Sequence, residues 1–300
     1  MDLSAVFNLS TLLNTVNTTT IVILAGLGCL MTDQAGMMNI GIDGMMVAGA
    51  FAAVMGSWLA GSWVVGLLFA LLTGLLFGAF YGLMVIRYKS DEFIIGVALN
   101  IFAVALTTFM LRSLPGQTGG SFHPTTGAVV KLPSLDLGII AGASVNISIM
   151  VPIAFLLVIA ASVMLHRTPL GFWLHASGEH PESLRSVGRS PERMKYLASL
   201  LCGMFCGLSG AYLSLGYLST FTENMSASRG YVAVACVIFG RSDPPLVLLA
   251  ALLFGAIDAC GTRMQSVIDP YLTSAMPYVG TILMMAVLAI RARLKQRAKA

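Results

Sequence analysis

Two polar side chains, Asn39 and Asp43, interrupt an otherwise apolar stretch that reads Gly36-Met-Met-Asn-Ile-Gly-Ile-Asp-Gly-Met-Met-Val-Ala-Gly-Ala50. A carboxylate at bilayer depth costs about 2.5–3.5 kcal/mol, so it is rarely left there without a partner or a polar cavity. Four residues apart, the two side chains would share one face of a helix. The glycines at 36, 41 and 44 weaken that helix, since each costs about 1 kcal/mol relative to alanine. Two interpretations are open. In the first, the stretch belongs to a permeation path or to a mobile joint. In the second, Asn39 and Asp43 are solvated at the cytoplasmic mouth, and the glycines allow close helix packing.

The composition is that of a polytopic membrane protein. Of 300 residues, 57% are hydrophobic and only 10% are charged, and the mean hydropathy is +0.87; a soluble domain carries about 25% charged residues. No basic segment precedes the first apolar run, so a cleaved signal peptide is not expected. The five cysteines lie in apolar stretches without a CxxC pair, which predicts packing roles. The net charge of +4 reflects the placement of Lys and Arg around a membrane rather than binding of nucleic acid.

The expected fold is all-α, because the chain divides into stretches long enough to span a membrane as helices, which requires about 20 mainly apolar residues. The stretch 218–240 differs, because only Tyr231 to Phe239 is strongly apolar, enough for about 13.5 Å of helix. It predicts a broken crossing or a re-entrant half-helix. We therefore expect one transmembrane domain over residues 1–300, with about eight to ten transmembrane helices and nine favoured. The candidate spans are 12–31, 38–60, 63–86, 93–111, 146–165, 196–217, 245–262 and 271–290.

Basic residues indicate the orientation of these spans. They concentrate in the loop 166–195 and in the tail after residue 290, and loops rich in Lys and Arg remain in the cytoplasm. Counting spans from there places two segments inside: the turn at Arg87 and Lys89, and the C-terminus. The N-terminus and the loop 113–145 are then outside. The tail returns inside only after an even number of crossings beyond Lys195, which favours 218–240 as a true crossing.

No pattern supports catalysis. The four histidines do not form a ligand set with the cysteines, and the sequence contains no HExxH, GxSxG or Walker A motif. We expect no catalytic residue, no metal site and no cofactor bound by this chain. If ATP drives transport, the ATPase is another chain.

The loop 166–195 contains a second informative segment. Pro181 suits the first turn of a helix, Glu182 is favourable near its positive end, and Gly188 is a natural stop. These residues predict a short surface helix of roughly 181–187, and Ser190-Pro191-Glu192 then reads as the cap and first turn of the next span. The helix is either a docking ridge for a partner or part of a solvated connector.

Four segments resemble the permease subunits of bacterial ABC importers related to the branched-chain amino acid and simple-sugar permeases. Ala35 to Phe51 resembles the family's AGxxNxGxEGxMLxGAF, and the DEFIIGVALN segment ending at Asn100 resembles its G-x-A-L-N stretch. ASGEHPESLRSVG, ending at Gly188, resembles the coupling loop GExPxAAxxAG. GYVAVACVIFG, from 230 to 240, resembles a fourth family segment. The resemblance is strongest to the nucleoside branch, which works with basic-membrane-protein-type binding lipoproteins.

The sequence departs from the family pattern at three places. Asp33-Gln34 replaces the usual Glu-Arg, Asp43 replaces a more frequent Glu, and Ser183-Leu184 replaces paired alanines. Loss of the arginine weakens the expectation of a fixed ion pair before the first motif.

The resemblance implies a set of partners. A permease domain over 1–300 would pair with a second permease, usually a different homologue but in some systems an identical copy. An ABC ATPase binding ATP and Mg would dock on the cytoplasmic side, and a substrate-binding lipoprotein on the outer side, in the bacterial cytoplasmic (inner) membrane among its lipids. Leu184 and Val187, three apart, would supply the apolar contact with the ATPase. The expected coupling residues are Gly178, Glu179, Pro181, Glu182, Leu184, Val187 and Gly188.

For the substrate path, the Asn100 amide could bind a base or a ribose hydroxyl, or could serve an interhelical hydrogen bond. The aromatic residues could stack on a base, or could pack as aromatics in spans usually do. Nucleosides are the expected substrates, with sugars, riboflavin or branched-chain amino acids as alternatives. A stand-alone secondary transporter would need ionisable groups in the membrane, for which Asp43 and Asp258 are the only candidates. The expected path residues are Asn39, Asp43, Asn100, Phe51, Phe93, Phe102 and Tyr231.

Overall fold

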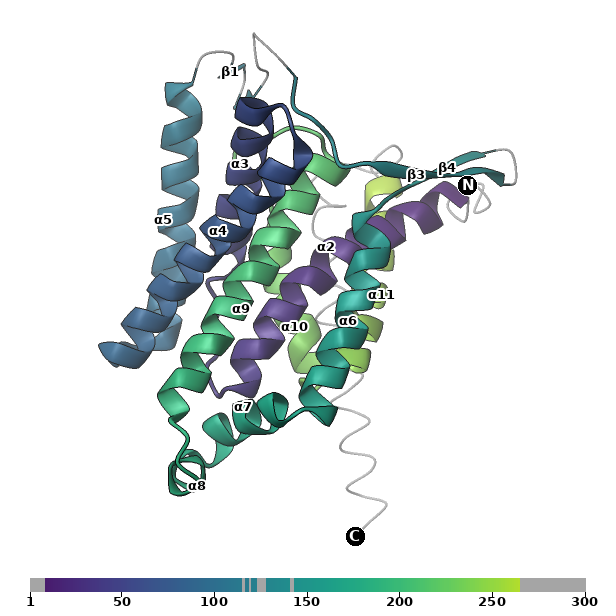
Figure 1. The fold of residues 1–300 in the computed structure, drawn as a ribbon. Coiled ribbons are helices and arrows are strands. Elements are labelled where there is room, and N and C mark those ends of the chain that lie inside the picture. The colour runs from purple at the N-terminus through teal and green to yellow at the C-terminus, as the bar shows by residue number, and fades with distance from the viewer. Residues whose placement is uncertain (1–8, 115–116, 119, 123–127, 141–142, 265–300) are drawn as a thin grey trace.

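The computed structural model describes residues 9–114, 117–118, 120–122, 128–140 and 143–264, and they form a helical bundle (Figure 1). Seven of its helices are long and apolar enough to cross a membrane. The first half comprises α2 (Leu9–Gln34), α3 (Ile42–Ala60), α4 (Trp63–Gly82) with its π-helical extension η1 (Leu83–Arg87), and α5 (Glu92–Ser113). The second half comprises α6 (Met150–Arg167), α7 (Pro169–Glu179), α8 (Pro181–Ser186), α9 (Pro191–Ala211) with its extension η2 (Tyr212–Tyr217), α10 (Arg229–Phe239) and α11 (Pro244–Met264). The predicted all-α polytopic class is confirmed.

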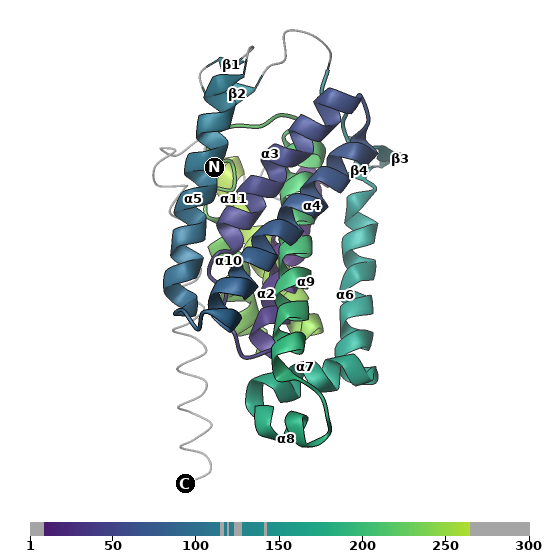
Figure 2. The ribbon, with the colours of Figure 1, turned by 60° about the vertical axis from the view of Figure 1, so that its left-hand side comes forward.

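The core is built from the helices that carry the most small residues. Helices α2 and α3 are buried along most of their length, and α9 packs between them and α4. Helices α4, α5, α6 and α11 are the least buried of the long helices and carry many exposed apolar residues. Figure 2 shows α5 and α6 on opposite sides of the bundle. Gly74, Gly78 and Gly82 form a ridge of small residues on α4 that faces α9, and a Cβ at Gly74 would collide with the carbonyl oxygen of Gly203. Close packing through small residues is typical of helices in membranes.

The two ends of the bundle carry different structures. Helices α7 and α8, here called the elbow, lie at one end, and the hairpin of β3 (Ser134–Ile140) and β4 (Ala143–Ser148) lies at the other (Figure 1). A shorter hairpin of β1 (Gln117–Thr118) and β2 (Ser121–Phe122) lies at the hairpin end too. The loops 113–145 and 166–195 thus lie at opposite ends, as predicted, but neither hairpin was expected from the sequence.

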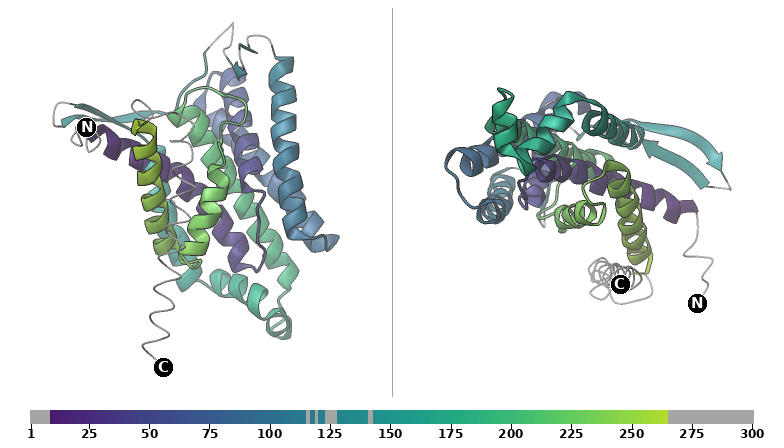
Figure 3. Two further views of the ribbon diagram at one scale, coloured as in Figure 1. Left: turned by 180° about the vertical axis from the view of Figure 1, so that it is seen from behind. Right: turned by 90° about the horizontal axis from the view of Figure 1, so that it is seen from below.

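The segment 218–240 crosses the bundle from end to end. At the hairpin end, the Phe122 N–H donates to the Phe221 carbonyl at 2.9 Å. Its first half is non-helical, and its second half is the 11-residue helix α10. At the elbow end, Gln34 Nε2 donates to the Ser242 carbonyl at 2.7 Å. The broken crossing is confirmed, and α10 and α11 lie side by side on the back of the bundle (Figure 3).

The other predicted spans match α2 to α6, α9 and α11 within a few residues at each end. Helix α9 begins at Pro191, ahead of its apolar run, and the predicted cap is confirmed: the Ser190 hydroxyl accepts from the Arg193 N–H at 3.2 Å. The candidate span 271–290 lies outside the described residues.

Candidate functional site

The connection from α2 to α3 is not helical, which corrects one prediction. Asn39 and Asp43 do not share a helix face, because α3 begins only at Ile42. Gly36 adopts a left-handed φ of +70°, and the Asn39 side chain folds back to accept from the Gly41 N–H at 2.8 Å. A local side-chain bond of this kind competes with helix formation. Residues 35–41 thus form a bent segment, here called the junction.

Neither polar residue of this stretch lies at a solvated mouth. Asn39 is 0% exposed and Asp43 is 6% exposed. Asn39 Nδ2 lies 3.3 Å from Cys202 Sγ on α9, so Asn39 holds the junction against the core.

Asp43 closes the start of the half-helix α10. Its Oδ1 accepts from the Gly230 N–H at 3.0 Å, and its Oδ2 accepts from the Ser226 hydroxyl at 3.0 Å. A negative charge at a helix N-terminus is favoured by the helix dipole and by the unpaired N–H groups there. A Cβ at Gly230 would lie 2.6 Å from the Asp43 nitrogen, so only glycine permits this approach. Since 11 residues of helix span about 16 Å, roughly half of a bilayer core, Asp43 lies near mid-membrane.

Asn100 joins three elements through one amide. Its Oδ1 accepts from the Gly44 N–H at 2.7 Å, and its Nδ2 donates to the Ile40 carbonyl at 3.0 Å and to the Tyr231 hydroxyl at 2.9 Å. The interhelical role is therefore confirmed for Asn100. Because Tyr231 accepts this bond, its own hydroxyl proton is directed elsewhere, and the side chain is 41% exposed. We call Asn39, Asp43, Asn100, Ser226 and Tyr231 the polar cluster.

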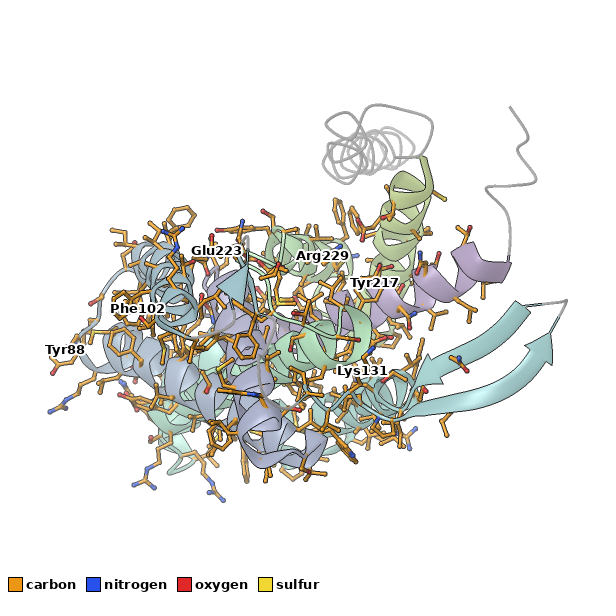
Figure 4. The ribbon with its side chains drawn as sticks, turned by 90° about the horizontal axis from the view of Figure 1, so that it is seen from above. Tyr88, Phe102, Lys131, Tyr217, Glu223 and Arg229 are labelled. Carbon is orange, nitrogen blue, oxygen red and sulfur yellow. The ribbon has the colours of Figure 1, made fainter. Side chains whose placement is uncertain are left out.

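The predicted phenylalanines do not join this cluster. Phe51 is buried and packs edge-on against Phe221, with ring centroids 5.2 Å apart. Phe102 is exposed and leans toward α4, where its ring lies 6.3 Å from that of Phe77. Figure 4 shows Phe102 at one side of the bundle, apart from Arg229 at the start of α10. Phe93 is exposed near the start of α5, so of these four predicted aromatic residues only Tyr231 contacts the polar cluster.

One ion pair near the cluster was missed from the sequence. Arg229, the first residue of α10, places Nη2 at 3.4 Å from Asp258 Oδ2 on α11, and both side chains are mostly buried. Its Nε has no hydrogen-bond partner among the described residues. An ionisable residue within a span usually pairs with another and faces the bundle interior. The signal for it was a lone arginine at the start of an apolar run, with an acidic residue in the next span.

The elbow contains the predicted short helix, but it corrects the role of one residue. Helix α8 covers Pro181–Ser186, and the chain turns away two residues later at Gly188, whose φ is +76°. Leu184 is only 3% exposed, whereas Val187 is 74% exposed. Leu184 packs inward because α8 lies against α7 and α9. It anchors the elbow, and Val187 alone of the two offers an apolar surface.

Charged contacts fix the elbow to the bundle. Arg185 bridges Glu182 at 2.9 Å and Glu192 at 2.7 Å. These contacts, that with Glu192 foremost, raise the pKa of the Arg185 guanidinium. Arg189 stacks over the ring of Trp173 at 4.1 Å. The remaining predicted coupling residue, Glu179, is exposed and lies 3.3 Å from His175.

The elbow also touches the junction directly. A Cβ at Gly178 would lie 2.7 Å from the Gly36 nitrogen, so the two backbones are in contact. His175 Nδ1 lies 2.9 Å from Gln34 Oε1 at the end of α2. A hollow of about 310 Å³ beside this contact is lined by both segments, including Gly36, Lys89, Glu92, Arg185 and Lys195. A displacement of the elbow therefore reaches the junction through backbone contact.

Within the described part of the chain, no group of three His, Cys, Asp or Glu side chains is placed to hold a metal ion. Of the five cysteines, four are buried and Cys260 is partly buried, in agreement with packing roles.

Comparison with known proteins identifies the family of this chain. A family model described as "Branched-chain amino acid transport system / permease component" matches residues 11–290. The putative glucose ABC transporter permease protein TsgC13 of Haloferax volcanii is 30% identical, over 92% of this chain and 91% of its own length. The guanosine ABC transporter permease protein NupQ of Bacillus subtilis is 29% identical, over 87% and 86%. The nucleoside ABC transporter permease protein NupC of Lactococcus lactis is 26% identical, over 88% and 87%.

No solved structure matches the chain. The family match nevertheless covers nearly all of it, including the junction, the polar cluster and the elbow. The protein belongs to the family of permease components of branched-chain amino acid transport systems, and it is a multi-pass membrane permease of the ABC transporter type.

Proposed function

We propose that this chain is a permease subunit of a binding-protein-dependent ABC importer that moves nucleosides into the cell. The similarity to guanosine and nucleoside permeases over most of the chain carries this proposal. The polar cluster supports it, because it presents a neutral donor, the Tyr231 hydroxyl, on an aromatic ring. Nucleosides are neutral, bear hydrogen-bond acceptors and have a face that an aromatic ring can stack on.

Glucose is the second candidate, because the relative that is 30% identical is a putative glucose permease. A sugar shares the hydrogen-bonding groups of a nucleoside but lacks the aromatic base. A preference for base-containing solutes therefore separates the two candidates.

The proposed assembly has two permease chains, a cytoplasmic ATPase and an outer binding protein. The elbow would face the cytoplasm, since its loop carries Arg167, Arg185, Arg189, Arg193 and Lys195. The ATPase would bind the elbow around Val187. A displacement of the elbow by the ATPase would then be transmitted to the junction through the contact of Gly178 with Gly36.

Replacing Val187 with Asp tests the docking surface. An unpaired charge in a desolvated interface costs several kcal/mol, so we expect the ATPase to be lost from the purified complex and uptake to fall to background. Membrane insertion stays unchanged, because Val187 is exposed at the end of the bundle. Leu184→Asp is a poorer test, because that side chain packs within the permease itself.

The matched control is Leu135→Asp, which places the same charge on an exposed leucine at the hairpin end. It should retain the ATPase. Normal co-purification of the ATPase with Val187→Asp would contradict docking at the elbow.

Replacing Tyr231 with Phe tests solute recognition. The change deletes one neutral hydrogen bond, which contributes about 1 kcal/mol, so we expect the initial rate of nucleoside uptake at low concentration to fall about fivefold. ATP hydrolysis stimulated by the binding protein should persist. Tyr88→Phe, an equal deletion at the exposed α4–α5 turn, is the control and should transport normally. Unchanged nucleoside uptake by Tyr231→Phe would exclude this hydroxyl from the path.

A further inference from the structure

The ion pair of Arg229 and Asp258 lies within the membrane-spanning part of the bundle. Arg229 starts the 11-residue half-helix α10, and Asp258 lies about 21 Å along α11 from its start at the elbow end, roughly two-thirds of a bilayer core. Neither side chain is sealed off, since Arg229 is 20% exposed and Asp258 is 27% exposed. Charged side chains at such a depth face the bundle interior or a water-filled cavity, because contact with lipid is costly. The exposed part of this pair therefore faces water rather than lipid.

The backbone that leads to Arg229 supports a cavity at this place. Residues 218–228 are non-helical, and irregular backbone at membrane depth is tolerated only where it is buried in protein or lines a water-filled cavity. Asn224, Ala227 and Ser228 have positive φ angles of 53°, 46° and 64°. Such conformations cost about 1–3 kcal/mol each for residues other than glycine, and they cluster at functional sites. The turn before Arg229 therefore has the strained geometry that is typical of a binding segment.

The pair also has unused hydrogen-bonding capacity. Arg229 Nη2 lies 3.4 Å from Asp258 Oδ2, and its Nη1 lies 3.5 Å from the Ser226 carbonyl oxygen, both longer than the usual range of about 2.7–3.2 Å. A guanidinium has five N–H donors, and within the described residues Asp258 makes no second side-chain hydrogen bond. Arg185 at the elbow differs, because its two carboxylate contacts are 2.9 and 2.7 Å long. A pair that only joined α10 to α11 would be expected to close in the same way.

We propose that Arg229 and Asp258 border the solute path and form hydrogen bonds with the solute as it passes α10. Side by side, they offer N–H donors and a carboxylate acceptor. The matching solute is neutral and carries an acceptor next to a donor, as each nucleobase does on its pairing edge. The identity of the solute rests on the proposed function, whereas the position of the pair on the path does not. The pair is distinct from Tyr231, which bonds to Asn100 on α5.

Thiol labelling from the outside tests whether the pair borders an aqueous path. The reconstituted transporter complex would carry single cysteines in a background cleared of the five native ones. Ser228→Cys replaces one atom beside Arg229 and leaves the ion pair intact. Leu253→Cys is the control, because Leu253 is an exposed apolar residue of α11 at a similar depth. We expect Ser228→Cys to react with a membrane-impermeant thiol reagent at least tenfold faster than Leu253→Cys.

A conservative substitution tests whether the pair contacts the solute. Arg229→Lys keeps the positive charge opposite Asp258 but removes the planar fork of donors. We expect guanosine uptake to fall about tenfold, the loss expected for one hydrogen bond to a charged group. The melting temperature and the ATP hydrolysis stimulated by the binding protein should stay near wild type, so that more ATP is hydrolysed per guanosine. Arg87→Lys, the same change at the exposed α4–α5 turn, is the control and should transport normally.

Each arm can overturn the proposal. If Ser228→Cys reacts no faster than Leu253→Cys, the pair is closed off from water. If Arg229→Lys takes up guanosine at the wild-type rate, the guanidinium does not contact the solute. If Arg229→Lys loses melting temperature and ATP hydrolysis together with uptake, the pair only joins α10 to α11. Uptake of glucose in place of guanosine by the wild type would refute the nucleoside assignment alone, and the same two arms, measured with glucose, would still decide the role of the pair.

Discussion

Replacing Asp43 with Ala should abolish transport and lower the thermal stability of the purified protein. The Gly230 N–H and the Ser226 hydroxyl both donate to this carboxylate near mid-membrane. Without it, both donors are left unsatisfied, at a cost of about 1–3 kcal/mol each. The start of α10 would also lose the charge that favours its helix dipole.

Asp43→Asn should be intermediate, because its amide oxygen still accepts from Gly230 and the Ser226 hydroxyl can rotate to accept from the amide nitrogen. Asp91→Asn is the control, since Asn caps a helix as well as Asp. Melting curves in detergent should therefore rank wild type and Asp91→Asn above Asp43→Asn, and Asp43→Ala lowest. An Asp43→Ala protein as stable and active as wild type would refute the role of this carboxylate.

Replacing Gly178 with Ala should uncouple the ATPase from transport. The added Cβ would lie 2.7 Å from the Gly36 nitrogen and 2.9 Å from the Gln34 carbonyl oxygen. Real side chains do not approach a backbone so closely, so α7 must move away from the junction. Because Val187 remains exposed, the ATPase should still bind. We expect ATP hydrolysis to continue while nucleoside uptake falls at least tenfold.

Gly26→Ala is the matched control, because its Cβ would meet Val247 at 3.4 Å and the Ala233 carbonyl oxygen at 3.9 Å, both ordinary contact distances. It should transport normally. If Gly178→Ala transports as well as Gly26→Ala, the elbow does not act on the path through this contact.

The sequence was most informative where one local property decides the structure. Long apolar runs predicted the spans, and the short run from Tyr231 to Phe239 predicted the broken crossing at α10. Pro181 and Gly188 predicted the bounds of α8, because each residue acts on its own turn of backbone.

Predictions that depended on tertiary contacts were less successful. The spacing of Asn39 and Asp43 suggested one helix face, but the Asn39 bond to Gly41 favours a turn. The spacing of Leu184 and Val187 could not show which one packs against the bundle, since a six-residue helix lacks enough turns to define its buried face.

The contact of Arg229 with Asp258 joins α10 to α11 across 29 positions. No local pattern predicts such a pair, because it depends on how two helices lie together. The resemblance pointed to four segments, and the structure separates their residues by burial: Asn39, Asp43 and Leu184 pack within the bundle, whereas Tyr231 and Val187 are among the exposed ones.

Uptake by the reconstituted transporter tests the central claim most directly. The chain, its second permease and its ATPase would be placed in proteoliposomes with the binding protein on the outside and ATP enclosed. We predict that labelled guanosine accumulates only with hydrolysable ATP and with this chain present, and that unlabelled nucleosides compete whereas glucose does not. Accumulation of glucose without guanosine, or guanosine uptake by this chain without the ATPase, would contradict the account.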